Sequence, residues 1–337
     1  MRGCLVAEVQ LTNLTKKFGK TTAVSDVSLT VGDGDFVVLL GPTGAGKTTT
    51  LRLIAGLERP DGGSIAIDGQ DVAYFSPAER NVAMVFQQYS LYPHLTVREN
   101  LAFPLKSPLL RTPPAEIERK VREVAEVLHI PHKLDNRATQ LSGGEMQRVS
   151  IGRALVRSPS IYLMDEPLSS LDAKLRAELR VELKRIQVSL GATLLYVTHD
   201  QIEAMTMATR IGVLDEGRLA QFGPPREIYE NPASTYVATR LGQPRINLAP
   251  VDLFGGHGPS GATQIGLRPE HLVTALGEGG NVTWVEHLGD QTRLHVDYRG
   301  HKLVTLVDAH TSLVAGDTVD LQVQGALYFD AEGKRVA

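Results

Sequence analysis

The stretch Gly41-Pro42-Thr43-Gly44-Ala45-Gly46-Lys47-Thr48 fits the pattern G-x-x-x-x-G-K-[ST] in full. An apolar run at residues 37–40 precedes it, and a helical pattern begins near Lys47. In such a strand–loop–helix context, the glycines let backbone N–H groups wrap a phosphate at the start of a helix, where the helix dipole favours anions. Lys47 would then reach the β- and γ-phosphates, and the Thr48 hydroxyl would bind Mg²⁺. The alternative is a glycine-rich turn that matches by chance, and the flanking strand and helix argue against it.

The chain around this loop alternates apolar runs with helical patterns. Residues 161–164 and 193–197 are two further continuous apolar runs, which are typical of strands in a parallel sheet covered on both faces. Residues 89–158 are mostly helical in pattern, with the clearest periodicity at 116–128. Residues 210–222 suggest a hairpin that turns at 215–217. The sequence therefore predicts an α/β core with a helical insertion.

Two carboxylates follow the second apolar run. Asp165 and Glu166 come directly after residues 161–164, and a carboxylate at the carboxyl end of a buried parallel strand lies beside the phosphate site. We expect Asp165 to hold Mg²⁺, directly or through water, and Glu166 to polarise an attacking water as general base. Two acids after an apolar run usually mark only a strand that ends at solvent. Together with the phosphate loop they indicate nucleotide hydrolysis.

A third motif, Leu141-Ser142-Gly143-Gly144-Glu145, precedes a helical segment at 146–156. Serine followed by two glycines at a helix start is either an ordinary N-cap or an anion-binding geometry, with the hydroxyl and free N–H groups aimed outward. Its position shortly before Asp165 favours the anion-binding interpretation.

In this order, residues 41–48, 141–145 and 165–166 resemble the ATP-binding subunits of ABC transporters, whose signature motif the Leu-Ser-Gly-Gly segment matches. The resemblance implies an α/β fold, a P-loop NTPase ABC cassette with a RecA-like core plus a helical subdomain, followed by a small all-β OB-like domain. It also implies an enzyme, an ABC-type ATPase that converts ATP and water to ADP and phosphate coupled to solute transport. ATP and Mg²⁺ are the expected cofactors.

The family's other motifs are matched one residue at a time. Phe18 stands where the family stacks an aromatic ring on adenine, with a core phenylalanine as the alternative. Gln87 matches the glutamine that senses Mg²⁺ and the water, and Asp172 closes a segment that resembles the D-loop. His199 matches the switch histidine that contacts the γ-phosphate, although a histidine after a strand is commonly structural.

These motifs give a full set of expected site residues. The expected catalytic residues are Glu166, His199 and Gln87, and the expected metal ligands are Thr48, Gln87 and Asp165. The expected nucleotide contacts are Phe18, Gly41, Pro42, Thr43, Gly44, Ala45, Gly46, Lys47, Thr48, Thr49, Ser142, Gly143, Gly144, Glu145 and Asp172. Glu145 departs from the family pattern, which usually has Gln there. The Ser142 hydroxyl and the glycine N–H groups are intact, so we expect activity to survive. Any contact from Glu145 to nucleotide would be made by an anion instead of an amide.

The resemblance extends over the whole chain and divides it. We expect the ABC cassette at residues 1–243, with its helical subdomain at about 89–158, a linker near 239–248, and an OB-like regulatory domain at 244–337. In the last part, short alternating runs with glycine turns predict antiparallel strands, and residues 265–270 and 285–289 resemble the regulatory domain of the maltose-importer type of ATPase. Six of the ten histidines follow residue 250, and we interpret them as scattered surface residues rather than as a metal sensor.

The resemblance also implies partners. The nucleotide would lie between Lys47 and Thr48 of one subunit and Ser142, Gly143 and Gly144 of a second copy, in a head-to-tail homodimer. The segment 89–94 would receive two transmembrane permease subunits, and an extracytoplasmic solute-binding protein would act through the complex. The expected location is peripheral, at the cytoplasmic face of the inner or plasma membrane. The expected solute is a carbohydrate or related polar molecule, with glycerol phosphate, polyamine, sulfate or iron as alternatives.

The composition of the chain argues against several other classes of protein. The chain has 337 residues, 35 basic and 38 acidic, and its formal net charge of -3 argues against a nucleic-acid partner. It contains no run of about 18 apolar residues, so we expect no membrane span. Its one cysteine, Cys4, cannot form an intrachain disulfide, which fits a reducing compartment, and residues 1–6 suggest a disordered extension.

Three other functions are alternatives: a soluble ABC protein of translation or DNA repair, a P-loop GTPase or kinase, and nucleic-acid binding by the β domain. The first would need a second cassette or long coiled coils. The second lacks an Asn-Lys-x-Asp guanine reader, which residues 132–135 only approach. The third lacks a basic, aromatic groove, since Trp284, Tyr298 and Tyr328 are scattered.

Overall fold

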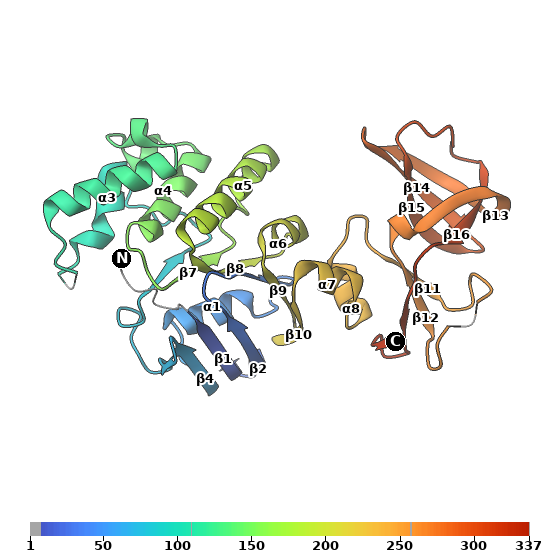
Figure 1. Ribbon diagram of the computed structural model, residues 1–337, viewed down its shortest axis with the longest axis horizontal. Helices are drawn as coiled ribbons and strands as arrows, with labels where there is room; N and C mark the ends of the chain where they lie inside the picture. The colour runs from blue at the N-terminus through green and yellow to red at the C-terminus, as the bar shows by residue number, and fades with distance from the viewer. Residues whose placement is uncertain (1–7, 109, 257, 337) are drawn as a thin grey trace. The chain divides into compact units, whose positions relative to one another are not determined.

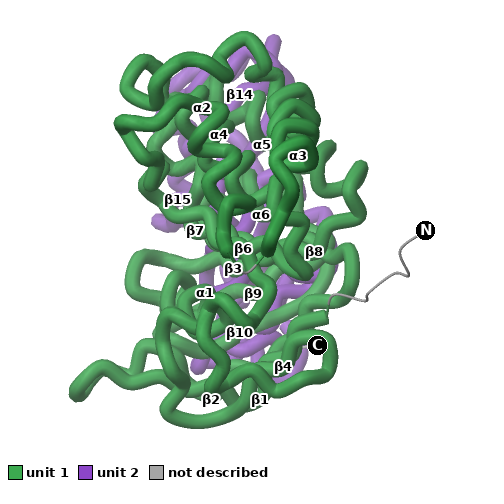
Figure 2. The backbone as a smooth tube through the Cα atoms, turned by 90° about the vertical axis from the view of Figure 1, so that its left-hand side faces the viewer, with its two compact units in different colours: residues 1–225 green, residues 226–337 purple. Residues whose placement is uncertain are grey.

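The computed structural model describes residues 8–108, 110–256 and 258–336, so the expected disordered extension at 1–6, with Cys4, lies outside the described residues. The chain forms two compact units, residues 1–225 and 226–337 (Figure 2). The sequence predicts that the cassette ends at residue 243, so the two divisions differ by residues 226–243, which contain two short helices. Among the described residues, no helix combines the length and the apolar character needed to span a bilayer.

The centre of the first unit is a six-stranded sheet in the order β10-β9-β3-β8-β7-β6. Every side chain of β3, β7 and β8 is buried, as expected for continuous apolar runs in a parallel sheet. The one antiparallel pair is the predicted hairpin of β9 and β10. The strands are β3 (Phe36–Leu40), β6 (Val82–Val85), β7 (Ile161–Asp165), β8 (Thr193–Thr198), β9 (Arg210–Asp215) and β10 (Arg218–Gly223).

A second, antiparallel sheet has the order β2-β1-β4-β5 and was not predicted. Helix α1 (Lys47–Ala55) packs between the two sheets, because its fully buried Leu51 and Ile54 belong to the same core cluster as residues of both. The helix that carries the phosphate loop is therefore fixed on two sides. The strands of this sheet are β1 (Val9–Phe18), β2 (Thr21–Val31), β4 (Gly62–Ile67) and β5 (Gln70–Asp71).

Helices α3, α4 and α5 lie at one end of the first unit, and β1, β2 and β4 lie at the other (Figure 1). The periodic segment predicted at 116–128 is α3, which begins at Pro114 because proline suits the first helical position. The helical elements are α2 (Val97–Ala102), η1 (Phe103–Lys106), α3 (Pro114–Val127), η2 (Pro131–Lys133), η3 (Ala138–Gln140), α4 (Gly143–Leu155), α5 (Ala173–Leu190) and α6 (Gln201–Met207).

The second unit contains two antiparallel sheets in the orders β11-β12-β17-β18 and β15-β14-β13-β16. The predicted alternation is regular in β14, where Leu294, Val296 and Tyr298 point into the core. Of the histidines here, His295 contacts Glu286 and His287 contacts Thr292, and His257 lies outside the described residues. The strands are β11 (Asn247–Pro250), β12 (Gln264–Leu267), β13 (Leu272–His287), β14 (Gln291–Tyr298), β15 (His301–Asp308), β16 (Thr318–Val323), β17 (Leu327–Phe329) and β18 (Arg335–Val336).

A buried arginine explains why α7 (Pro225–Glu230) and α8 (Thr235–Arg240) group with the second unit. Arg268 is 2% exposed, and its guanidinium donates to the carbonyl oxygens of Tyr229, Ala238 and Leu241. It also lies 3.8 Å above the ring of Tyr229. A buried cation needs partners of this kind, and here the helical segment supplies them to the β unit.

Candidate nucleotide-binding site

The loop between β3 and α1 leaves the start of the helix without a side-chain cap. Gly46 is the N-cap of α1 with φ 95°, it offers no side-chain cap, and the first turn holds no acidic residue. Gly46 cannot be replaced there, since a Cβ would lie 2.4 Å from the carbonyl oxygen of Ala23 in addition to the unfavourable φ. A helix start with these properties attracts an anion.

Lys47 is the buried cation of this loop, with a side chain only 5% exposed. Its Nζ donates to the carbonyl oxygens of Gly41 at 2.9 Å and Pro42 at 3.0 Å. It also lies 3.3 Å from Oε1 of Glu166. The structure therefore brings together the lysine of the phosphate loop and the glutamate that follows β7, as the sequence predicted.

Thr48 and Asp165 form the second contact between the loop and β7. The Thr48 hydroxyl donates to Oδ1 of Asp165 at 2.8 Å. Burial raises the pKa of the Asp165 carboxyl, and the hydrogen bond from Thr48 partly opposes that shift. A hydroxyl and a carboxylate are the hard oxygen ligands that Mg²⁺ prefers, and a divalent cation would offset the burial of the carboxylate. These residues therefore fit a magnesium ion.

Glu166 and His199 meet beside this pair. Oε2 of Glu166 lies 2.9 Å from Nδ1 of His199, whose side chain is 59% exposed, whereas that of Glu166 is 15% exposed. Glu166 has φ 42°, and its N–H donates to the carbonyl oxygen of Val197 in β8 at 3.1 Å. This hydrogen bond fixes the unusual backbone, so that one carboxylate faces both Lys47 and His199.

Two of the expected residues are exposed and lie at or just after the ends of strands. Gln87 is exposed and follows β6, which is separated from β3 by β7 and β8 in the sheet. Phe18 is 47% exposed at the end of β1, with Lys16 Nζ 5.2 Å from its ring centre. It is therefore not a core phenylalanine, and its ring is accessible to a ligand.

The signature segment lies at the start of α4. Ser142 is the N-cap and accepts from the N–H of Glu145, while Oε2 of Glu145 accepts from the N–H of Ser142 at 2.8 Å. Oε1 of Glu145 lies 3.0 Å from Nζ of Lys133. Burial opposes ionisation, but the Ser142 hydrogen bonds and Lys133 together lower the pKa of Glu145. Glu145, expected as a nucleotide contact, thus uses its carboxylate within its own helix start.

Asp172 is also a helix cap in this structure. It is the N-cap of α5 and accepts from the N–H of Leu175 at 3.0 Å. Two residues beside these motifs were not predicted, namely Lys133 next to Glu145 and Arg176 next to the segment 168–172. Neither residue belongs to a motif, and only the fold shows their contacts.

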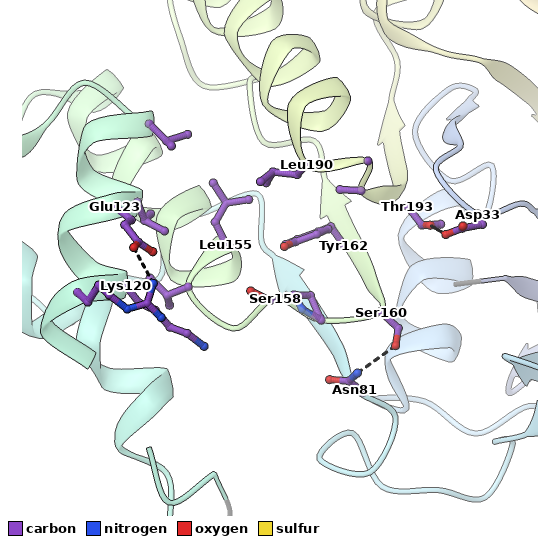
Figure 3. A pocket seen from close by; sticks show the side chains of 17 residues that line it. Asp33, Asn81, Lys120, Glu123, Leu155, Ser158, Ser160, Tyr162, Leu190 and Thr193 are labelled. Atoms are coloured by element: carbon purple, nitrogen blue, oxygen red, sulfur yellow. Dashed lines mark hydrogen bonds and ion pairs between the residues drawn. The ribbon is translucent and has the colours of Figure 1, made fainter. Parts of the chain in front are cut away.

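The cavity in Figure 3 lies elsewhere in the first unit. It has a volume of about 680 Å³ and is lined by Asn81, Ser160 and Thr193 at the amino ends of β6, β7 and β8, and by Lys120 and Glu123 of α3. Asp165 ends β7 and Glu166 follows it, at the opposite edge of the sheet. The cavity is therefore distinct from the phosphate-loop cluster.

A glycine-rich loop between a buried parallel strand and a helix, with Lys47, the Thr48–Asp165 pair and Glu166 converging on it, defines a P-loop NTPase. Matches to known proteins identify the family within this class. Residues 24–169 match the family model described as ABC transporter, and residues 265–327 match the TOBE domain. The chain belongs to the ABC transporter family, and it is an ABC-type ATPase that binds ATP.

Relatives match over nearly the whole chain. The sn-glycerol-3-phosphate import ATP-binding protein of Rhizobium meliloti (strain 1021) is 45% identical over 98% of this chain and 100% of its own length. The trehalose/maltose import ATP-binding protein of Thermococcus litoralis is 44% identical over 94% of this chain and 95% of its own length. The sn-glycerol-3-phosphate import ATP-binding protein of Brucella abortus biovar 1 is 51% identical over 79% of this chain and 78% of its own.

Solved structures of ATP-binding cassettes match part of the chain. One is a dimeric post-hydrolysis state of an ATP-binding cassette bound to ADP and phosphate, with 33% identity and a TM-score of 0.58 over 65% of this chain and 99% of that chain. Another is the ADP conformation of an ATP-binding cassette, with 26% identity and a TM-score of 0.60 over 68% of this chain and 98% of that chain.

Proposed function

We propose that this ATPase powers the import of a carbohydrate or a related polar solute, and that glycerol phosphate is the alternative within that class. Support comes from the two relatives of 45% and 44% identity, whose names specify sn-glycerol-3-phosphate import and trehalose/maltose import. Both align over more than nine tenths of this chain, and the TOBE match falls in its second unit.

The observation that carries the proposed chemistry is the position of the Glu166 carboxylate, 2.9 Å from His199 and 3.3 Å from Lys47. Lys47 and the N–H groups at the start of α1 bind the β- and γ-phosphates. Glu166 accepts the proton of a water that attacks the γ-phosphorus, and the bond to the leaving ADP oxygen breaks. His199 orients the γ-phosphate.

Thr48 and Asp165 would hold Mg²⁺, with Gln87 completing the ligand set from the end of β6. When bound, Mg²⁺ neutralises charge on the β- and γ-phosphate oxygens. Phe18, which is 47% exposed, stacks on the adenine.

The proposed partners use two other surfaces. Ser142, Gly143 and Gly144 face the nucleotide of a second copy in a head-to-tail homodimer, and one similar cassette has a dimeric structure. A groove of about 270 Å³ lies beside the segment 89–94, lined in part by Phe86, Tyr89 and Phe103. Phe86 and Phe103 are 42% and 47% exposed, which suits a docked permease helix.

We further infer that the homodimer binds two permease subunits through this groove in each of its two copies, at the cytoplasmic face of the membrane. A solute-binding protein joins the complex through the permease subunits. Tyr92 lies against Phe103 with 4.4 Å between ring centres, and Arg153 lies 4.8 Å from the Tyr92 ring and donates to the carbonyl oxygen of Ser90. These contacts fix the backbone that a permease would touch.

Glu166→Gln tests the chemistry, because the amide keeps the shape of the side chain but cannot accept the proton. We expect hydrolysis to fall by a factor of about 10² to 10⁴ while ATP binding is retained. Glu178→Gln, the same change at an exposed position of α5, should leave both unchanged. Undiminished hydrolysis by Glu166→Gln would remove Glu166 from this role.

The same variant tests the transport assignment when it is isolated from membranes. Two integral membrane subunits should co-purify with it, and the wild-type complex in vesicles should take up a sugar or glycerol phosphate on addition of ATP. Isolation with nucleic acid in place of membrane subunits would contradict the importer assignment but leave the chemistry standing.

A further inference from the structure

We propose that Arg176, in the first turn of α5, is a positioning residue that keeps the side chains of Glu166 and His199 at the separation needed for hydrolysis. The inference rests on the proposed function, because it takes Glu166 as the base and His199 as its partner. Arg176 touches neither of them. It contacts the two loops that carry them.

The first of these loops is the turn between β7 and α5, at residues 168–172. Nη2 of Arg176 donates to the carbonyl oxygen of Leu171 at 2.8 Å and to that of Ser169 at 3.5 Å. Nε donates to the carbonyl oxygen of Leu168 at 3.3 Å. A planar guanidinium with several fixed donors can satisfy such a set of carbonyls, whereas the ammonium of a lysine cannot reproduce the fork.

The second loop follows β8 and carries His199. Nη1 of Arg176 lies 3.7 Å from Oδ2 of Asp200, the residue after His199. The other oxygen of Asp200 accepts from the N–H groups of Ile202 at 2.7 Å and Glu203 at 3.3 Å, as the N-cap of α6. Asp200 is therefore fixed to α6 on one side and to Arg176 on the other.

These contacts close a ring around the reacting groups. Both the N–H and the hydroxyl of Ser169 donate to the carbonyl oxygen of Glu166, at 3.2 and 2.8 Å. The Glu166 carboxylate meets His199 at 2.9 Å, and His199 is bonded through the chain to Asp200. Starting at Glu166, the ring passes through residues 168–171, Arg176 and Asp200 to His199, and back to Glu166.

The ring has a mechanical consequence. Glu166 and His199 come from different strands, so their separation depends on how the two following loops are held. The Arg176 side chain is 31% exposed and that of Asp200 is 22% exposed, so the link is partly shielded from water. Loss of the link would let the loops shift, and a displacement of about 1 Å in a catalytic group can lower a rate by about 10²-fold.

Three variants separate the parts of the link. Arg176→Gln removes both the carbonyl contacts and the charge, and we expect kcat for ATP hydrolysis to fall about 10- to 100-fold with KM and the melting temperature nearly unchanged. Arg176→Lys keeps a charge for Asp200 but loses the fork, and should lie between Arg176→Gln and wild type. Asp200→Asn keeps an oxygen to cap α6 but loses the charge, and should show a smaller fall in kcat.

Because both act through one link, the double variant Arg176→Gln/Asp200→Asn should be no slower than Arg176→Gln alone. Arg185→Gln is the matched control, since Arg185 is an exposed arginine of the same helix. Wild-type kcat in Arg176→Gln, or a fall in kcat that merely follows a fall in melting temperature across the three variants, would overturn the inference.

Glu166→Gln, measured in parallel, keeps this outcome distinct from failure of the proposed function. If Glu166→Gln is inactive and Arg176→Gln is normal, only the positioning role is wrong. If Glu166→Gln is as active as wild type, the proposed role of Glu166 is wrong and the inference about Arg176 is overturned with it.

Discussion

Glu145 is the residue at which this chain departs from the pattern of its family, and the structure shows how the extra charge is accommodated. Its carboxylate accepts the N–H of Ser142 and lies 3.0 Å from Lys133 Nζ. An acidic residue in the first turn also suits the helix dipole. The negative charge is therefore paired at the start of the helix that carries the N–H groups of Gly143 and Gly144, which we propose face a phosphate.

Removing Lys133 should show how the unpaired charge of Glu145 affects the KM for ATP. We expect Lys133→Gln to raise the KM for ATP about threefold at low salt, because an unpaired carboxylate then lies beside the proposed phosphate contacts. Glu145→Gln should have a KM near that of wild type, and the double variant should return to that value. Steady-state hydrolysis measures the KM of the wild type, of both single variants and of the double variant, which completes the double-mutant cycle.

Lys120→Gln, the same change on α3, serves as the control for this cycle. A double variant with the KM of Lys133→Gln alone would contradict the charge-pairing account.

The residues of the site differ in how well the sequence could predict them. Lys47 and Thr48 are consecutive in a motif, and Asp165 and Glu166 end an apolar run, so local pattern is sufficient to place them beside one another. Lys133 and Arg176 act through partners that only folding brings near, such as Asp200, which is 24 residues beyond Arg176 in sequence. No local pattern marks a side chain whose partners are backbone carbonyls.

At the scale of secondary-structure elements, strands that are buried on both faces were predictable and the others were not. The strands β3, β7 and β8 are continuous apolar runs, which is the signal used. The strands β1 and β2 were not predicted, because register shifts along the pair interrupt the alternation of apolar and polar residues. In addition, Asn13 has φ 51° within β1. An irregular strand loses the period of two that identifies it.

Helix α6 carries a buried acid that the proposed chemistry does not use. Glu203 is 2% exposed and accepts from the hydroxyl of Tyr196 at 2.8 Å. Burial raises its pKa above 4.5, Asp200 adds to the shift, and the hydrogen bonds from Thr198 and Tyr196, with the charge of Arg176, oppose it.

This shift predicts a pH-dependent effect of Glu203→Gln. A raised pKa means that the folded protein keeps a proton that the unfolded chain has lost, so this contribution to stability is present at low pH and is lost as pH rises through the folded value. Glutamine is neutral throughout and keeps an oxygen for Tyr196. The melting temperature of Glu203→Gln relative to wild type should therefore rise between pH 4.5 and pH 8, by about 2–4 °C for each unit of pKa shift.

Thermal unfolding across that range, with the exposed Glu126→Gln as control, checks the expectation. A difference between variant and wild type that is constant with pH would contradict it.

At the scale of the whole molecule, Arg268 joins segments of the second unit that are distant in sequence. The helices α7 and α8 supply carbonyl groups to its guanidinium. The compact unit that contains Arg268 begins at residue 226, whereas the proline and glycine residues after 242 predict a linker near 239–248, and that boundary stays a prediction. Composition could not reveal these contacts, because the partners of Arg268 lie 27 to 39 residues before it.

Arg268→Met tests this arrangement in the full chain. It would leave the carbonyl oxygens of Tyr229, Ala238 and Leu241 without their donor, at a cost of about 1–3 kcal/mol for each group that stays buried. We expect the second unit to unfold at lower temperature and proteases to cut faster within 226–245. Arg226→Met, at a side chain that is 86% exposed, is the control. Equal cleavage and melting in Arg268→Met and wild type would show that the segment is held by other contacts.

The sheet order described above also bears on how the chain is made. Strand β3, with Phe36 and Leu40 at its ends, pairs on one side with β8 at 193–198 and on the other with β9 at 210–215. Both neighbours emerge from the ribosome more than 150 residues after β3. The most apolar strand of the core is thus made early and paired late, and it must be shielded from association during most of synthesis. The glycines and aspartates at 32–35 and the phosphate loop at 41–48 border it on both sides, so the loop proposed to bind nucleotide also interrupts an aggregation-prone run before the fold exists.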